Sequence, residues 1–377
     1  MTRTQKTIIS ILSIIIVALL GGIGYYAFQS YRVFASQPLG PLLPFSQAEL
    51  PSTWTPSAGT PLASLGEVTL VPTIAFPTAT SSAPLCGGPK TMNILMVGAD
   101  SRADSYLYGL GDAIRLVRVD FVTPKVSVLE FPRDLWVEIP NIADNLDGQN
   151  HEKLNQAYLY GQPGFGYWDD PSGGPGLLSL TLDQNFGVNV DHYVSINMRT
   201  FEKVVDSVGG IDVHIPDKKT ADSTGLTIGD IHLNGSEALK VARNRKEGTF
   251  ARADNQNVVF CGLRKKLTNP KVVTEIPKLI DSFKDNIITD FTPAQIGQLA
   301  CLGTKLPPQN IVFATFPQEL FSQARIYDPV FKKRVFIWDV NFDTLRYYVN
   351  RFQGGTWPEP RVDVPATAEA GSEVICE

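Results

Sequence analysis

Two aspartates stand where the chain leaves one apolar segment and enters the next. Asp100 follows the apolar run 92–97, and Asp112, twelve residues later, precedes the alternating segment 114–121. Carboxylates brought together at neighbouring strand ends can bind a hard cation such as Mg²⁺, which prefers oxygen ligands. The alternative is a pair of solvated loop carboxylates, because most aspartates lie at protein surfaces. The spacing alone leaves both interpretations open.

A second group of candidate residues is basic. The planar guanidinium of arginine matches the geometry of phosphate oxygens, so clustered arginines indicate an anion site. Arg243 and Arg245 can face one ligand only if the helix that precedes them ends near Arg243, since residues i and i+2 share a face in extended chain. The alternative is an ordinary solvated surface. The group comprises Arg133, Lys153, Arg243, Arg245 and Arg252.

Composition excludes several classes of protein. Hydrophobic residues make up 43% of the 377 residues and charged residues 19%, which is typical of a folded globular chain. The net charge of −5 argues against nonspecific nucleic-acid binding, which requires a basic surface. The phosphate-binding loop, the G-x-S-x-G elbow and the H-E-x-x-H zinc motif are all absent from the sequence. A histidine-built zinc site is not expected, because the four histidines are scattered: His151, His192, His214 and His232.

The N-terminal region predicts a membrane anchor. Residues 7–28 contain no charged side chain, and as a helix they would span about 33 Å, enough to cross a bilayer core. Arg3 and Lys6 precede this run, so the positive-inside rule places residues 1–6 in the cytoplasm. A cleaved signal peptide is the alternative, although the run exceeds the usual apolar core of about 7–15 residues. We therefore expect a single-pass protein of the cell membrane with an extracytoplasmic main domain.

The anchor is followed by a stalk and one large domain. Ten prolines lie between residues 33 and 90, with only three charged side chains. Proline removes backbone donors and favours extended chain, so residues 29–90 are predicted to form a semi-rigid stalk. Residues 91–377 then form the folded domain.

Hydrophobic periodicity indicates a mixed α/β domain. Apolar runs and alternating segments predict strands over 92–97, 114–121, 125–131, 191–197, 211–215 and 311–315. Periodic apolar positions predict helices over 200–208, 235–243, 253–267 and 293–302, the second of them capped by Asn234 with Glu237. Residues 331–335 and 342–352 are expected to complete the sheet and its helical cover. Alternating strands and helices favour a mixed sheet with helices on both faces.

Four cysteines suit an exported domain. They permit three pairings, among which the sequence does not choose. Because domain termini often lie close together, we favour Cys86–Cys376 with Cys261–Cys301. Buried free thiols are the alternative.

Six ordered sequence blocks between about residues 93 and 267 resemble the LytR-CpsA-Psr family. The final block, FARADNQNVV (Phe250–Val259), resembles that family's last motif. The five others are NILMVGADSR (Asn93–Arg102), FPRDLWVEIP (Phe131–Pro140), KLNQAYLYG (Lys153–Gly161), FEKVVDSVGGIDVHIP (Phe201–Pro216) and LNGSEALKVARNR (Leu233–Arg245).

The resemblance implies an envelope phosphotransferase. Proteins of this family transfer a glycopolymer from a polyprenyl-pyrophosphate carrier to peptidoglycan or another cell-wall acceptor, with Mg²⁺, and hold the lipid in an apolar tunnel. By resemblance, Asp100 and Asp112 would bind Mg²⁺. Asp100 and a metal-bound hydroxide are the two candidate bases for the acceptor hydroxyl. The pyrophosphate would be contacted by Arg133, Lys153, Arg243, Arg245 and Arg252, with Gln256 beside it.

Two positions depart from the family pattern. An arginine is usual where Leu110 stands, two residues before the second aspartate, and another where Asn255 stands. Arg102, Arg115 or Arg118 are candidates to replace them, and we expect Arg102 to bind substrate. These departures leave two alternatives open: a weakened polyprenyl-phosphate-binding scaffold or regulator, and a hydrolase that cleaves the pyrophosphate.

Overall fold

The computed structural model describes the folded domain and a short N-terminal segment. Its described residues are 21–22, 24–26, 28–44, 83–101, 109–142, 149–246, 248–269, 272, 286–359 and 374–376. No helix within these ranges is long and apolar enough to cross a membrane. The predicted span 7–28 lies largely outside them, as do residues 45–82 of the predicted stalk.

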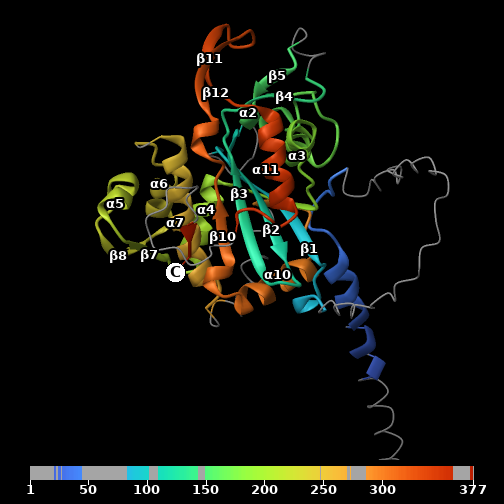
Figure 1. Ribbon diagram of the computed structural model, residues 1–377. Helices are drawn as coiled ribbons and strands as arrows, with labels where there is room; N and C mark the ends of the chain where they lie inside the picture. Colours follow the sequence, from blue (N-terminus) through green and yellow to red (C-terminus); the bar gives the residue numbers. More distant parts are fainter. Residues whose placement is uncertain are drawn as a thin grey trace, which may run out of the picture.

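A seven-stranded mixed sheet forms the centre of the domain (Figure 1). Its strand order is β13-β10-β3-β2-β1-β6-β9, with β1 parallel to β6, β3 parallel to β10, and β2 antiparallel to both its neighbours. The strands are β1 (Thr91–Ala99), β2 (Gly111–Asp120), β3 (Lys125–Phe131), β6 (His192–Asn197), β9 (Ile287–Thr289), β10 (Ile311–Ala314) and β13 (Val374–Ile375).

Helices cover both faces of the sheet, which confirms the predicted fold class. Alternation along β1 divides the core: Leu95 and Val97 pack on one face, and Met92 and Ile94 on the other. The first face is covered by α2 (Leu154–Tyr160), α3 (Gly173–Phe186) and α11 (Phe342–Gln353), the second by α7 (Thr249–Leu267) and α10 (Pro293–Lys305).

Among the described residues, three two-stranded sheets lie outside this main sheet. The segment 211–215, predicted as a strand, pairs with a neighbour that periodicity did not reveal, and residues 331–335 join a separate hairpin rather than the main sheet. The hairpins are β4 (Trp136–Glu138) with β5 (His151–Lys153), β7 (Ile211–Ile215) with β8 (Gly229–Leu233), and β11 (Ser322–Asp328) with β12 (Lys333–Asp339).

A smaller core links the second hairpin to the main domain. Val205, Ile211 and Val241 are buried in it, together with Val259 of α7. The helices of this region are α4 (Met198–Ser207), α5 (Lys218–Thr224) and α6 (Gly235–Ala242). The predicted capping box is present at α6, because Asn234 accepts from the Glu237 backbone and Glu237 accepts from that of Asn234.

Residues within the predicted stalk pack against the edge of the sheet. The Leu39 backbone donates to the Phe291 carbonyl over 2.9 Å, and the Tyr193 hydroxyl donates to the Pro41 carbonyl over 2.6 Å. Leu43 is 2% exposed and belongs to the main core. The chain just before residue 45 is therefore part of the folded body, beside β9.

The structure corrects the favoured disulfide pairing. The bonds are Cys86–Cys301 and Cys261–Cys376, with Cα–Cα distances of 5.9 and 5.2 Å. The two ends of the domain do not meet each other, because Cys86 lies on a turn beside α10 while Cys376 follows edge strand β13. Each end is instead tied to a helix on the second face of the sheet.

Candidate functional site

The sheet topology brings the predicted carboxylates and the first arginine to one edge. Asp100 directly follows β1, Asp112 is the second residue of β2, and Arg133 lies two residues beyond β3. Because β2 is antiparallel to both neighbours, its start meets the ends of β1 and β3. The Asp100 backbone donates to the Leu110 carbonyl over 2.8 Å, which closes the intervening loop.

Asp112 is the centre of the cluster. Its Oδ1 accepts from Arg133 at 2.5 Å and from Asn155 at 3.2 Å, and its Oδ2 accepts from Arg245 at 3.0 Å. Its backbone carbonyl accepts from Arg252 at 2.8 Å. Three of the predicted phosphate-binding arginines thus converge on one aspartate, although they come from a strand end, an interhelical segment and α7.

The positive charges around Asp112 favour the binding of an additional anion at the cluster. Burial opposes ionisation of Asp112, but the Arg133 and Arg252 guanidiniums outweigh it and hold its pKa below the usual value. The pKa of Arg252 is lowered, first by burial and then by repulsion from Arg133 and Arg245, against the attraction of nearby carboxylates. Its buried Nε has no acceptor among the described residues. An arriving phosphate would relieve this repulsion.

Lys153 joins the cluster through a residue that sequence reasoning missed. Asp134 accepts from Arg133 Nε at 3.3 Å and from Lys153 Nζ at 2.7 Å. Asn155, also missed, binds Asp112 from the first turn of α2. Both could have been noticed, since Asp134 directly follows Arg133 and Asn155 lies two residues after Lys153.

Arg243 is not brought to the cluster in the structure, and Arg102 is not among the described residues. The helix ends at Ala242 as the shared use of Arg243 and Arg245 required, and Arg243 is its C-cap. Arg243 is exposed, however, and its side chain forms no hydrogen bond or ion pair with the described part of the chain, although its backbone N–H donates to the Leu239 carbonyl over 3.0 Å. Arg102 lies outside the described residues, so its predicted role stays a prediction.

Gln256 lies in a buried network next to the cluster. Its Oε1 accepts from Arg115 at 3.0 Å, and its Nε2 donates to the Ala242 carbonyl at 3.2 Å. The amide therefore joins α7 to β2 and to the end of α6. This geometry is that of a residue that holds α7 against Arg115 of β2 and against the end of α6, just before Arg245.

Arg115 anchors that network and is not free to replace a missing arginine. It is 2% exposed, and it donates to Glu130 and Asn257, each over 2.7 Å. Burial lowers its pKa, whereas the Glu130 carboxylate raises it. Its guanidinium carbon lies 4.9 Å from the centre of the Phe260 ring. All these partners lie inside the domain, between the sheet and α7.

Arg118 and Asn255 are also bonded to residues away from the cluster. Arg118 lies towards the far end of β2, where it donates to Asp120 at 3.1 Å and to the Gln353 carbonyl at 2.9 Å. Asn255, at the place of a family arginine, donates to the Ser223 carbonyl and accepts from the Ser223 hydroxyl. It faces α5.

Asp100 and Asp112 would fit a magnesium ion whose remaining ligands are water and the phosphate of the substrate. Asp100 Oδ1 is buried and has no hydrogen-bond donor among the described residues. Those residues contain no group of three or more acidic, histidine or cysteine side chains that could hold a metal. Mg²⁺ is often held by one or two carboxylates plus water and phosphate, so Asp100 and Asp112 would be sufficient if Asp112 released an arginine.

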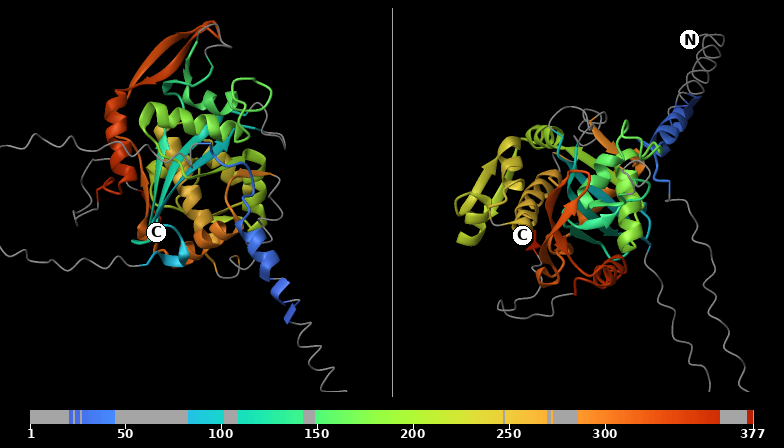
Figure 2. Two further views of the ribbon diagram at one scale, coloured as in Figure 1. Left: turned by 90° about the vertical axis from the view of Figure 1, so that its right-hand side faces the viewer. Right: turned by 90° about the horizontal axis from the view of Figure 1, so that it is seen from above.

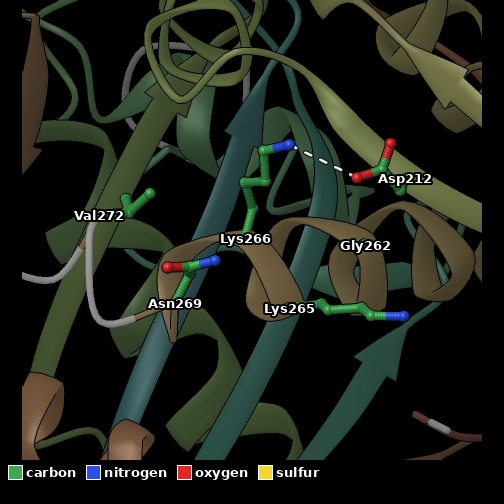
Figure 3. Close-up of a pocket in the computed structure, with 6 residues that line it drawn as sticks. All are labelled: Asp212, Gly262, Lys265, Lys266, Asn269 and Val272. Atoms are coloured by element: carbon green, nitrogen blue, oxygen red, sulfur yellow. Dashed lines mark hydrogen bonds and ion pairs between the residues drawn. The ribbon is translucent and has the colours of Figure 1, made fainter.

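Two cavities lie near α7, and the smaller one adjoins the cluster around Asp112. A gap of about 10 Å³, too small for a lipid chain, lies between β3, α7 and β10 and is lined in part by Glu130, Phe250 and Phe316. A cavity of about 280 Å³ lies towards the other end of α7, where Lys266 points to Asp212 over 3.4 Å (Figure 3). The larger cavity contains none of the predicted site residues.

The sequence of the chain matches that of a known protein family. The profile of the LytR_cpsA_psr family matches residues 80–336. A polyisoprenyl-teichoic acid–peptidoglycan teichoic acid transferase TagU from Oceanobacillus iheyensis is 30% identical over 202 residues, covering 53% of this chain and 58% of TagU. Regulatory protein MsrR from Staphylococcus aureus is 30% identical over 213 residues, covering 55% and 58%. The chain thus matches under two-thirds of either relative's length.

Solved structures share the fold. Bacillus subtilis TagV superposes with a TM-score of 0.52 at 23% identity, covering 70% of this chain and 98% of TagV. TagT bound to LIIa-WTA superposes with a TM-score of 0.50 at 21% identity, covering 70% and 90%. Since the family profile spans most of the domain and includes the strand-end cluster, the chain belongs to the LytR_cpsA_psr family.

Proposed function

We propose that the protein is an envelope phosphotransferase that moves a glycopolymer from a polyprenyl-pyrophosphate carrier to a cell-wall acceptor such as peptidoglycan. The observation that carries this proposal is the convergence of Arg133, Arg245 and Arg252 on Asp112. The name of the relative TagU, a teichoic acid transferase, supports a substrate of this class. We further propose that the domain is extracytoplasmic and is anchored in the cell membrane by residues 7–28.

The arginines would bind the pyrophosphate in the place that Asp112 now partly fills. Arg245, with a side chain 51% exposed, is the most accessible of the three, while Arg133 and Arg252 lie deeper. Phosphoryl transfer depends on positioning and charge stabilisation more than on a protein nucleophile. Mg²⁺ held by Asp100 and Asp112 would add a further positive charge beside the phosphates.

The proposed reaction replaces one bond to phosphorus by another, and it requires a base and a correctly held Arg133. A bond forms between the acceptor hydroxyl oxygen and the phosphorus that carries the glycan, and the phosphoanhydride bond breaks, so that polyprenyl phosphate leaves. The hydroxyl proton must pass to a base, for which the orphaned Asp100 Oδ1 is the candidate. Lys153 and Asp134 would hold Arg133 in place during the exchange.

The test is a transfer assay on the full chain in detergent, with a lipid-pyrophosphate-linked glycan and peptidoglycan. We expect Arg133→Ala to reduce transfer about 10- to 100-fold, since one charged hydrogen bond contributes about 1.5–3 kcal/mol. Asp100→Asn and Asp112→Asn should lower transfer and weaken its response to added Mg²⁺. Lys90→Ala, an exposed lysine before β1, is the control. Full transfer by Arg133→Ala would refute the proposed site.

A binding or regulatory role is the second candidate, and Asn255 is the observation that favours it. Its amide is committed to Ser223, so no cation takes the place of the family arginine there. A protein of this kind would retain a polyprenyl phosphate through purification but transfer nothing. Mass spectrometry of an organic extract, followed by the transfer assay, separates the two functions and also detects the hydrolase alternative through glycan released to water.

A further inference from the structure

The hairpin β11–β12 stands apart from the main sheet. It projects from the end of the domain opposite to the helical residues 28–36, drawn in blue (Figures 1 and 2). Its strands pair in continuous register from Ser322–Asp339 to Asp328–Lys333. Directly opposed residues of an antiparallel pair share a face, so the register defines two faces.

One face packs inwards; the other is open towards the tip of the hairpin but packed at its base, where Trp338 lies against Phe250. Ala324, Ile326, Val335 and Ile337 lie on the inner face with Asp328, which is 1% exposed. On the outer face Arg325 is opposite Phe336, and Tyr327 is opposite Arg334. We call this outer set, Arg325, Tyr327, Arg334 and Phe336, the hairpin face.

Positive charge and exposed rings distinguish the hairpin face and the tip beside it. Tyr327 is 57% exposed and Phe331 is 47% exposed, and the Lys333 ammonium lies 5.4 Å from the centre of the Phe331 ring. Lys332 is also exposed, while Asp328 is buried, so the exposed charges from residue 325 to 338 are all positive. This local basic surface contrasts with a chain whose net charge is −5.

The base of the hairpin contacts residues next to Arg133 and Arg252 of the cluster around Asp112. The Trp338 backbone donates to the Asp134 carbonyl over 3.1 Å, and Trp338 forms a bridge with Leu135. The Trp338 ring lies 5.4 Å from that of Phe250, two residues before Arg252. A molecule held at the cluster would therefore meet the hairpin as it extends outwards.

We propose that the hairpin face binds the acidic glycan chain of the donor polymer, next to its pyrophosphate. Guanidiniums bind phosphate or carboxylate groups along such a chain, and exposed rings offer flat apolar surfaces to the sugars. This inference rests on the proposed function, since it places the glycan beside the cluster. Position favours a glycan over a membrane, because the hairpin lies opposite the segment that leads from the N-terminal apolar run.

The experiment measures polymer binding by the full chain in phosphatidylcholine nanodiscs. The probe is a fluorescent, glucose-substituted poly(glycerol phosphate), with uncharged dextran as the comparison. We expect Arg325→Glu with Arg334→Glu to weaken binding at least about tenfold at low salt, because charge-assisted contacts to phosphate are lost and repulsion replaces them. Lys90→Glu with Lys305→Glu changes the net charge equally at exposed sites elsewhere and should leave binding unchanged.

A second variant tests the sugar contact without changing charge. Tyr327→Ala removes an exposed ring and should weaken binding of the glucose-substituted polymer more than that of unsubstituted poly(glycerol phosphate). Unchanged binding by the charge-reversed variant would overturn the proposal. Binding to phosphatidylglycerol vesicles through the same arginines, with none to the polymer, would overturn it in favour of a membrane surface.

Failure of this inference is distinguishable from failure of the proposed function. Arg133→Ala should reduce transfer about 10- to 100-fold while the hairpin still binds free polymer. If the hairpin variants bind like the parent protein but Arg133→Ala loses transfer, only the hairpin assignment is wrong. If the hairpin binds polymer as expected but the parent protein transfers nothing, only the proposed reaction is wrong.

Discussion

A buried carboxyl group should make the stability of this protein fall as the pH rises towards neutrality. Glu152 of β5 is 0% exposed, and neither of its carboxylate oxygens has a donor among the described residues. Burial, then repulsion by Asp328, raises its pKa to about 7. Asp328 comes from the end of β11 and accepts from the Phe331 backbone over 3.0 Å. Glu152 is therefore protonated in the folded protein at mildly acid pH.

The sign and size of the effect follow from the two states. In the unfolded chain Glu152 titrates near 4.5, so between that value and about 7 only the folded protein binds the proton. The free energy of unfolding therefore decreases as the pH rises through this window. A shift of about 2.5 units, at about 1.4 kcal/mol per unit, gives a loss of up to roughly 3 kcal/mol.

Glu152→Gln keeps the shape of the side chain and removes its titration. We expect this variant to lose that part of the pH dependence and, at pH 8, to exceed the parent protein in unfolding free energy by up to roughly 3 kcal/mol. The assay is urea unfolding of the full chain, followed by tryptophan fluorescence, at steps from pH 4.5 to 8.

A matched control isolates the buried group. Glu319→Gln alters an exposed glutamate near β11 and should leave the profile unchanged. The informative quantity is the difference between parent and variant at each pH, because other groups titrate in both. If that difference is the same at pH 5 and pH 8, the argument from burial and from Asp328 is refuted.

Three further predictions concern stability. Arg115→Met should cost about 3–5 kcal/mol by leaving Glu130 buried and unpaired, whereas Arg115→Met with Glu130→Leu should recover most of the loss in the same urea assay. Asn234→Ala should cost about 1 kcal/mol because it removes the cap of α6, detected as a lower thermal midpoint. Replacing Cys86 and Cys301 by alanine should cost about 2–5 kcal/mol; an unchanged thermal midpoint would show that this bond does not stabilise the fold.

The elements that position the site were predictable because they depend on local patterns. The alternation of 114–121 and 125–131 predicted β2 and β3, and the apolar run 92–97 predicted β1. With those three strands, Asp100, Asp112 and Arg133 had to come to one edge of the sheet. Arg245 and Arg252 were already candidates as basic residues, and the family resemblance assigned them to the pyrophosphate; the structure places both on Asp112.

The features that could not be predicted from the sequence depend on contacts between segments that lie far apart along the chain. Cys86 and Cys376 were paired because they bracket the domain, but which helix each end meets is set by packing on the second face of the sheet. Hairpin β11–β12 has the alternation of a strand pair but no feature that excludes it from the main sheet. The partners of Arg115 are Glu130, on the neighbouring strand, and residues of α7 more than a hundred positions away.

The absence of two family arginines has a physical consequence that the geometry makes clear. Burial first, and then the guanidiniums of Arg133 and Arg245, already lower the pKa of Arg252, so a further cation beside the cluster would add to this repulsion in the absence of substrate. Asp112 contacts all three arginines: its carboxylate accepts from Arg133 and Arg245, and its backbone carbonyl accepts from Arg252. Three cations around one such carboxylate keep the cluster positive enough to attract a phosphate. Loss of the Asp112 carboxylate should therefore disorder Arg133 and Arg245 as well as weaken the proposed binding of Mg²⁺, so Asp112→Asn is expected to be more damaging than Asp100→Asn.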